Sequence, residues 1–297
     1  ENKILIPLGI TKHLLIKKLS YIGNYQSDYM LPIISKNFSV KKNTFSKVWN
    51  KVINDIGYVD LISFNQQTHF INRTPNPFFD IYKSILVGRA THTNLNNKWD
   101  ETYNYIFSSK TRQTDRRKLK KVKLNGEYKF LIANTIKEKD GIIKAMIQQK
   151  IKRFNKTNVW NMFSKQEYIE FYQSHSKREN SSRFKMHFSA IMINDIYIAT
   201  HFGIIFNDTF FYLMAGQDEE SFSKFSPGRL LVIELMSWAS HNKLKIFDFT
   251  GGNELYKEHW ATSQVPIYNM IKINSFLGEV YYFFETLLKK MKKFKIL

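Results

Sequence analysis

Apolar and polar positions follow one another along the chain in a pattern that predicts an α/β fold. Between Asn43 and Gly57 the apolar residues recur at helical spacing, and Gly57 marks the predicted end of this helix. Strands are predicted before it, at residues 2–8 and in the Ser20–Gly23 region, and after it at Tyr58–Phe64. Helices and strands that alternate in this way are typical of α/β proteins.

From residue 127 onward the predicted elements follow a regular order. Strands are predicted at Glu127–Asn134, Phe184–Ile193, Ile196–Phe206, Thr209–Ala215, Lys245–Phe249 and Ile267–Ile273. Helices are predicted at Asp140–Phe154, Ser164–Ser174, Pro227–Asn242 and Asn253–Trp260. Ser164 and Glu167 have the spacing of a capping box, and Asn194-Asp195 indicates a hairpin. The resulting order is β-α-α-β-β-β-α-β-α-β.

Two further predicted helices carry an excess of positive charge. The first spans Trp99–Lys123, and its second half holds Lys110, Arg112, Arg116, Arg117, Lys118, Lys120, Lys121 and Lys123 against Asp115 alone. The second is the tail, where Leu287, Leu288, Met291, Phe294 and Leu297 alternate with Lys289, Lys290, Lys292, Lys293 and Lys295. Both patterns are typical of solvated helix faces. They also fit binding of a polyanion at the first helix and of an anionic membrane surface at the tail.

Composition narrows the class of protein. The chain has 297 residues, which suits two domains, and 43% of them are hydrophobic, so packed cores are expected. Its 45 Lys and Arg residues against 25 Asp and Glu give a formal charge of +20. Such a field attracts polyanions, although the composition typical of AT-rich genomes produces a similar excess. There is no cysteine, which excludes disulfides and thiol nucleophiles, and the eight histidines show no metal-binding spacing.

The ends of the sequence and its apolar runs bear on location. The first residue is Glu1 and a strand follows at once, so we expect that the sequence begins inside a domain. No uninterrupted apolar run approaches the roughly 18–20 residues of a membrane helix. Together with the lack of cysteine, this favours a cytoplasmic location, with the inner face of the membrane as a second possibility for the basic segments.

The candidate chemistry lies within residues 210–260. Ser226 is predicted to cap a helix, Pro227 suits its first position, and Gly228 lets a ligand approach the backbone. Arg229 adds a cation beside the N–H groups that a helix start leaves unpaired, so a pyrophosphate is a candidate ligand. The same residues are also typical of an ordinary capped helix.

The element order and the motifs of this region resemble the GNAT acyltransferase fold. The resemblance is carried by Ser226-Pro227-Gly228 with Leu230-Leu231, Phe247-Asp248-Phe249 with Gly251-Gly252, Glu254-Leu255-Tyr256-Lys257, Ser27-Asp28-Tyr29 and Arg116-Arg117-Lys118-Leu119. The chain is most similar to the bacterial cellulose-biosynthesis-type acetyltransferase-like branch. Its members, like the Fem-type aminoacyltransferases, have two GNAT-like halves.

The resemblance implies two GNAT-like lobes with mixed central sheets flanked by helices. Its implied boundaries are a partial N-terminal lobe at 1–123, an acyltransferase lobe at 124–275 and a basic amphipathic helix at 276–297. It also implies an acyl-CoA donor held at 226–229 and direct transfer of an acyl group, such as acetyl, to an amine or hydroxyl of a sugar, polysaccharide or cell-envelope precursor. The usual glycine-rich phosphate loop of the family is replaced here by Ser226–Arg229.

Catalytic roles follow from the same resemblance. Tyr256 becomes the candidate proton donor to the leaving thiolate, and Lys257 a candidate to neutralise phosphate or the developing oxyanion. The acceptor's proton needs a base, for which His201, Asp218 and Glu254 are candidates. His201 is also typical of a core histidine, and Asp218 of a solvated loop.

Substrate contacts are expected at the end of a buried strand. Asp248, Gly251 and Gly252 end the strand before the last predicted helix, and side chains at such strand ends line a crevice. Asp248 is a candidate to orient the acceptor, and a capping or core aspartate is the alternative.

Two other functions are compatible with the sequence. A Fem-like transferase would take its acyl group from aminoacyl-tRNA, and the formal charge of +20 favours such a donor. A degenerate GNAT pair without activity would instead bind nucleic acid or an anionic membrane. In that case changes at Gly228 or Tyr256 would leave the function intact, whereas removal of charge from residues 112–123 or from the tail would abolish it.

Overall fold

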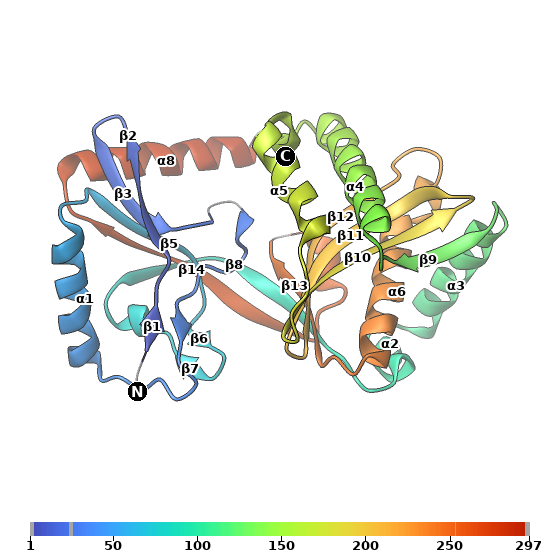
Figure 1. Ribbon diagram of the computed structural model, residues 1–297, viewed down its shortest axis with the longest axis horizontal. Coiled ribbons are helices and arrows are strands. Elements are labelled where there is room, and N and C mark those ends of the chain that lie inside the picture. The colour runs from blue at the N-terminus through green and yellow to red at the C-terminus, as the bar shows by residue number, and fades with distance from the viewer. Residues whose placement is uncertain (1–2, 24–25, 253, 295–297) are drawn as a thin grey trace. The chain divides into compact units, whose positions relative to one another are not determined.

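The chain forms two compact units. The structure is a computed structural model that describes residues 3–23, 26–252 and 254–294, with side chains described up to residue 288 (Figure 1). One unit comprises residues 1–90, 251–253 and 264–297, and the other comprises residues 91–250 and 254–263. The boundaries predicted at 123 and 275 divide the chain differently, because residues 91–123 group with the second unit and residues 264–275 with the first.

The first unit is built on a mixed sheet. Its strands are β1 (Ile4–Leu5), β2 (Leu8–His13), β3 (Ile16–Tyr21), β4 (Ile33–Ile34), β5 (Leu61–Gln67), β6 (Phe70–Ile71), β7 (Thr74–Pro75), β8 (Lys83–Asn94) and β14 (Ser263–Ile273). Its helices are α1 (Lys42–Ile56), the 3₁₀ turn η2 (Pro77–Asp80) and α8 (Phe276–Phe294). The sheet order is β2-β3-β5-β14-β8, with β3 parallel to β5 and β14 antiparallel to it.

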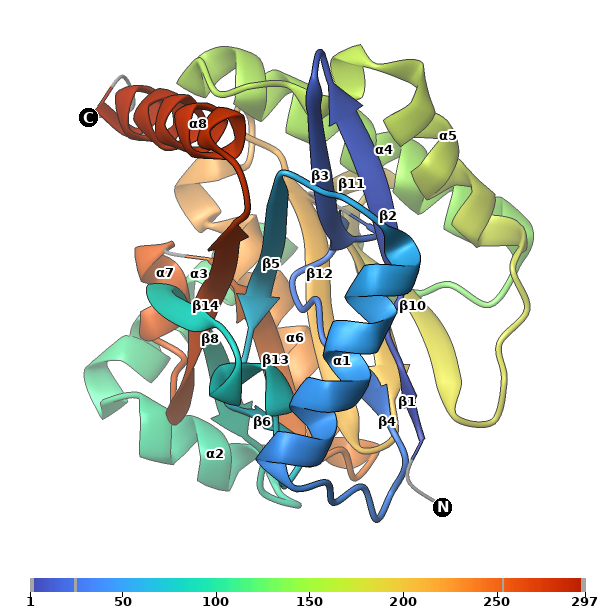
Figure 2. The ribbon, with the colours of Figure 1, turned by 90° about the vertical axis from the view of Figure 1, so that its left-hand side faces the viewer.

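Helix α1 closes one face of this sheet over an aromatic core (Figure 2). Trp49 of α1 lies edge-on to Phe64 of β5 and to Phe78, with ring centroids 5.9 and 5.0 Å apart. All three side chains are at most 2% exposed. Because successive side chains of a strand point to opposite faces, Ser63 and Asn65 of β5 belong to the other face.

Helix α8 is fixed to the first unit at its start. The Ser275 hydroxyl donates to Asp60 Oδ1 (2.6 Å), and the Lys17 N–H donates to Asp60 Oδ2 (2.9 Å). These hydrogen bonds lower the pKa of Asp60. Further along α8, Glu285 forms an ion pair with Lys18 of β3 (3.0 Å). The predicted tail helix is therefore present, whereas the predicted positions of Lys289–Lys293, Met291, Phe294, Lys295 and Leu297 lie outside the described side chains.

The second unit contains the predicted regular order of elements. Its helices are α2 (Trp99–Ile106), α3 (Ser109–Lys123), α4 (Ile136–Thr157), α5 (Gln166–Ser174), α6 (Pro227–His241) and α7 (Leu255–Glu258), with the 3₁₀ turns η3 (Met162–Ser164), η4 (His175–Lys177) and η5 (Ser223–Phe225). Its strands are β9 (Tyr128–Ile132), β10 (Phe184–Ile193), β11 (Ile196–Phe206), β12 (Thr209–Gln217) and β13 (Ile246–Gly251), in the sheet order β13-β12-β11-β10-β9. With β14, the predicted β-α-α-β-β-β-α-β-α-β order is confirmed. The hairpin at Asn194-Asp195 is confirmed too, since both residues have positive φ angles, 45° and 63°.

Three helix starts differ from the prediction. The predicted helix over Trp99–Lys123 is two helices, because Ser108 accepts from the Thr111 N–H and begins α3. The capping box of α4 is formed by Thr135 and Glu138, upstream of the predicted start. Ser164 does not cap α5, since its hydroxyl donates to the carbonyl of Asn161, the residue before η3.

None of the described helices is long and apolar enough to span a membrane.

We predict that Gly278→Ala destabilises the packing of the start of α8 against Asp60. A Cβ at this position would lie about 3.0 Å from the carbonyl carbon of Asp60 and closer still to its oxygen, so the backbone must move. Overpacking of this kind costs about 1–3 kcal/mol, which chemical denaturation will measure as a lower free energy of unfolding. Gly57→Ala is not a suitable control because Gly57 has φ 86°, whereas Gly9→Ala is, since a Cβ there makes an ordinary 3.4 Å contact. Equal stability of Gly278→Ala and Gly9→Ala would show that the close contact between α8 and Asp60 is not required.

Candidate functional site

The Arg229 guanidinium is occupied by a buried carboxylate. Its Nε and Nη2 donate to the two oxygens of Asp115 on α3, at 2.7 and 2.8 Å. The guanidinium also lies over the rings of Phe107 and Trp260, 4.5 and 4.8 Å from their centroids. Tyr103 donates its hydroxyl to the same carboxylate (2.6 Å), and burial beside that charge raises the pKa of Tyr103. Arg229 therefore holds α3 and α6 together, and its charge is already paired.

The backbone N–H groups at the start of α6 are paired as well. Pro227 has no N–H, the Gly228 N–H donates to Gln217 Oε1 (3.0 Å), and those of Arg229 and Leu230 donate to the carbonyl of Ser226 (3.0 and 3.2 Å). The predicted side-chain cap is wrong, because Ser226 adopts φ 55° and makes no such hydrogen bond.

The hydroxyl of Ser226 has another partner. It accepts from Lys118 Nζ on α3 (2.8 Å), and a Cβ on Gly228 would collide with the Gln217 amide. A phosphate at this helix start must therefore displace Gln217 first.

The strand end at β13 holds a paired carboxylate. Asp248, 3% exposed, accepts from the Thr250 N–H (2.6 Å) and lies 3.3 Å from His92 Nε2 on β8. This arrangement fits the capping alternative for Asp248. The structure groups Gly251 and Gly252 with the first unit. Gly252 has φ 136°, a backbone conformation that glycine adopts easily and other residues rarely do.

Two of the candidate bases, His201 and Asp218, have structural roles. His201 is fully buried on β11, stacks on Tyr212 with 4.6 Å between centroids, and its pKa falls well below the ordinary value because burial disfavours its charged form. Asp218 Oδ1 accepts from the N–H groups of Glu220 and Phe222 (3.1 and 2.7 Å) and so shapes the loop before α6. Neither residue joins the cluster described next.

Helices α4 and α7 bring a group of charged and phenolic side chains together. Lys150 on α4 lies within electrostatic range of Arg153, one turn further along α4, and of Glu254 and Lys257 beside and on α7. Tyr256 interacts electrostatically with Glu254 and Arg153. We call Lys150, Arg153, Glu254, Tyr256 and Lys257 the α4–α7 cluster.

The cluster contains three cations and one carboxylate. Lys257 Nζ lies 3.1 Å from Glu254 Oε2, and the lysine side chain is 8% exposed against 55% for the glutamate. Burial and the neighbouring Arg153 lower the pKa of Lys150 to about 8, from an ordinary 10.5. Cations held close enough to disfavour one another form a site that an anion stabilises.

Tyr256 keeps its proton at this site. Its pKa is raised, first by desolvation and then by the charge of Glu254. The ring packs at the edge of Phe249 on β13, with 6.5 Å between centroids, while 42% of the side chain stays exposed. A protonated phenol that is also accessible can donate to a leaving group.

The sheet of the second unit positions α4. Gln149 of α4 accepts from the Thr200 hydroxyl (2.7 Å) and donates to the carbonyl of Tyr197 (2.9 Å), both on β11. These hydrogen bonds fix the orientation of α4 about its own axis. They thereby set the directions in which Lys150, the next residue, and Arg153, one turn later, project from the helix.

Sequence reasoning missed Lys150 and Arg153. Lys150 follows Met146 by four residues on the apolar face of α4, which is an unusual place for a lysine and the one available signal. Of the predicted residues, the cluster unites Tyr256, Lys257 and Glu254.

Within the part of the chain that the structure describes, no group of three or more His, Asp or Glu side chains is arranged to hold a metal ion.

The strand order and the helices around it define a GNAT-like α/β fold. A family model described as an acetyltransferase (GNAT) domain matches residues 109–258, from α3 to α7. The matched segment covers half of the chain, so the chain belongs to this family. A search of curated protein sequences found no significant match.

Solved structures share the fold at low sequence identity. The C-terminal domain of a protein from Agrobacterium fabrum described as a lysylphosphatidylglycerol synthetase is 10% identical, with 97% of this chain and 89% of that chain covered and a TM-score of 0.56. L-PGS from Bacillus licheniformis is 11% identical, with 98% and 90% covered and a TM-score of 0.55. FemX is 12% identical, with 91% and 87% covered and a TM-score of 0.54. These similarities confirm the predicted mixed α/β fold, and the cellulose-biosynthesis-type branch stays a prediction.

We predict that Lys150→Met stabilises the protein at pH 7. The folded protein disfavours a charged Lys150, since its pKa is about 8 when folded and near 10.5 when unfolded. Between these two pH values the unfolded chain binds more protons, so this cost is largest below pH 8 and disappears as the pH rises to 10.5. The variant should gain about 1–3 kcal/mol in free energy of unfolding at pH 7, measured by denaturation across this pH range. Lys144→Met, an exposed position on the same helix, is the matched control. A gain that does not change with pH would contradict the assignment.

Proposed function

We propose that the chain is an acyl-group transferase whose reaction centre is the α4–α7 cluster. The observation that carries this proposal is the grouping of a protonated, accessible Tyr256 with three cations and the Glu254 carboxylate. Membership of the GNAT family supports transfer as the reaction class.

The transfer needs no covalent intermediate on the protein. The acceptor amine or hydroxyl attacks the acyl carbonyl and forms a new C–N or C–O bond, while its proton passes to the Glu254 carboxylate. The bond to the donor's leaving sulfur or oxygen then breaks, and Tyr256 gives its phenolic proton to that atom. Lys257 faces the oxyanion that develops between these steps and stabilises it.

The donor carries phosphate, and its anionic part binds at Lys150 and Arg153. At the start of α6, by contrast, each N–H is already paired and Arg229 is committed to Asp115. Acyl-CoA, the expected donor, fits a cationic anchor of this kind. The acceptor class, a sugar or cell-envelope precursor, stays a prediction from sequence, as does a cytoplasmic location.

We predict that acetyl-CoA or a longer acyl-CoA raises the unfolding temperature and that the double variant Lys150→Gln, Arg153→Gln removes this shift. A donor at 100 times its dissociation constant contributes about 2.7 kcal/mol, which thermal unfolding detects easily. Gln217→Ala should leave donor binding unchanged, because the α6 start is not the anchor. Tyr256→Phe should bind the donor normally and lose turnover by about 10²–10⁴-fold.

The variants separate the possible outcomes. Tighter binding by Gln217→Ala with no effect of the double variant would move the donor site to α6. The absence of any shift with acyl-CoA would exclude coenzyme A donors and leave the second candidate.

The second candidate is a transferase that uses aminoacyl-tRNA. It is favoured by the exposed face of α3, where Arg116, Arg117, Lys120 and Lys121 are solvent-exposed. The protein from Agrobacterium fabrum is described as a lysylphosphatidylglycerol synthetase, a name that combines an amino acid with a lipid, and this supports an aminoacyl donor as the alternative. Salt-dependent binding of tRNA that is lost on Arg116→Gln, Arg117→Gln supports it, and salt-insensitive or absent binding contradicts it.

A further inference from the structure

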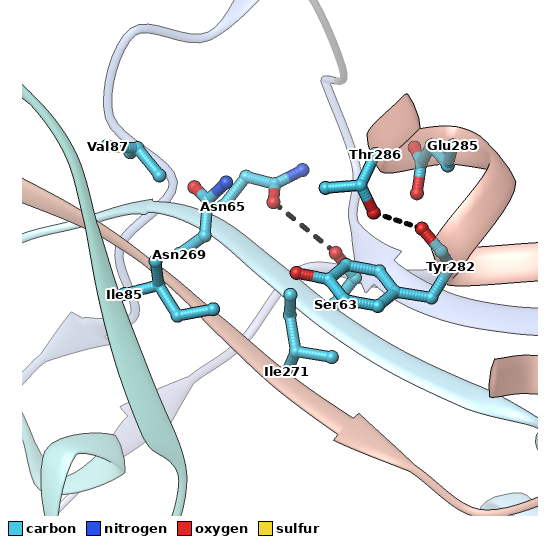
Figure 3. Close-up of a pocket in the computed structure, with 9 residues that line it drawn as sticks. All are labelled: Ser63, Asn65, Ile85, Val87, Asn269, Ile271, Tyr282, Glu285 and Thr286. Carbon is cyan, nitrogen blue, oxygen red and sulfur yellow. Dashed lines mark hydrogen bonds between the residues drawn. The ribbon is translucent and has the colours of Figure 1, made fainter. Parts of the chain in front are cut away.

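The first unit contains a small pocket of its own (Figure 3). Its floor is the face of the sheet opposite α1 and its wall is one face of α8. The lining residues are Ser63 and Asn65 of β5, Asn269 and Ile271 of β14, Ile85 and Val87 of β8, and Tyr282, Glu285 and Thr286 of α8. The cavity measures about 180 Å³. Drug-sized ligands occupy about 300–1,000 Å³, so this pocket suits a smaller one.

The polar groups of the pocket offer hydrogen bonds in both directions. Asn269 Oδ1 accepts from the Gln66 N–H (3.2 Å), and Asn65 Oδ1 accepts from the Ser63 hydroxyl (3.3 Å). Both amide oxygens are thus engaged, and in the described part of the chain the Nδ2 donors of the two asparagines have no protein acceptor. The carboxylate of Glu285 supplies acceptor oxygens at the α8 wall.

The pocket carries no excess charge. Both carboxylate oxygens of Glu285 accept from Lys18 Nζ, at 3.0 and 3.2 Å, so the negative charge of the wall is balanced. Ile85 and Val87 present aliphatic surface, each 42% exposed, and Tyr282 adds an aromatic ring. The pocket therefore offers no unpaired charge to an ionic ligand. An uncharged ligand with hydroxyl groups and an apolar C–H face could form hydrogen bonds with the polar groups and pack on the aliphatic surface.

The backbone is irregular where the two asparagines meet. Asn269 of β14 lies opposite two residues of β5, Asn65 and Gln66, so the bulge is in β5. Gln66, within this bulge, has φ 54°, a left-handed conformation that glutamine rarely adopts. The Asn269–Gln66 hydrogen bond joins the bulge to β14. Bulges and positive φ angles concentrate at binding sites, where they direct a side chain at a cost in stability.

We infer that this pocket binds an uncharged monosaccharide unit. Adjacent hydroxyls of the sugar accept from the Asn65 and Asn269 amides and donate to the Glu285 carboxylate, and its C–H face lies on Ile85 and Val87. This inference does not depend on the proposed transferase activity, because no residue of the α4–α7 cluster lines the pocket.

Saturation-transfer NMR on the full chain tests the inference with glucose, galactose and N-acetylglucosamine as probes. At least one sugar should bind saturably. Asn65→Ala should weaken that binding roughly tenfold, the effect of one lost hydrogen bond of good geometry. Ile85→Trp should abolish it by filling the cavity from an exposed position, which leaves the polar network and the core intact.

Asn50→Ala is the matched control, since Asn50 is an exposed asparagine of α1 on the opposite side of the sheet. It should bind the sugar as the unaltered chain does. Three results would overturn the inference: no binding of any of the sugars, sugar binding that both Asn65→Ala and Ile85→Trp retain, or preferential binding of inorganic phosphate at this pocket.

Discussion

The ion pair between Asp115 and Arg229 is the interaction on which the second unit most depends. Two parallel charge-assisted hydrogen bonds join α3 to α6, and the aromatic rings of Phe107 and Trp260 enclose the guanidinium. Removal of one partner from such a buried pair typically costs about 3–5 kcal/mol, because the other charge is left without compensation. The pair therefore fixes α6 against α3 and at the same time withdraws Arg229 from ligand binding.

This constraint separates what the sequence can predict from what it cannot. The order of ten elements and the Asn194-Asp195 hairpin followed from local periodicity and turn chemistry, which act over a few residues. The role of Arg229 could not be predicted in this way, because its partner is 114 positions away in sequence. The same holds for Gly228, whose N–H is taken by a glutamine side chain from the end of β12. These local rules identified the start of α6 correctly. They wrongly suggested that its N–H groups and Arg229 are free to bind a ligand.

The cluster at α4 and α7 shows the opposite situation. Tyr256 and Lys257 were predicted from a short motif, while Lys150 and Arg153 belong to a helix about one hundred residues earlier and become visible only in the fold. Burial disfavours the charged form of Lys150, and the nearby charge of Arg153 adds to this cost. A protein retains such a cost where an anion or a proton transfer makes use of it. In this respect the cluster differs from the Asp115–Arg229 pair, in which every charge is already satisfied.

Whether the α4–α7 cluster binds the donor is tested most directly by the pKa of Lys150, measured with and without donor. NMR of isotopically labelled lysine gives this pKa, and the variant Lys150→Gln assigns the signal. We expect a pKa near 8 in the free protein. We also expect this pKa to rise when a phosphate-bearing donor binds, because the bound anion stabilises the charged form. A pKa near the ordinary 10.5 that does not move when the donor is added would contradict the claim that this cluster is the anion-binding reaction centre.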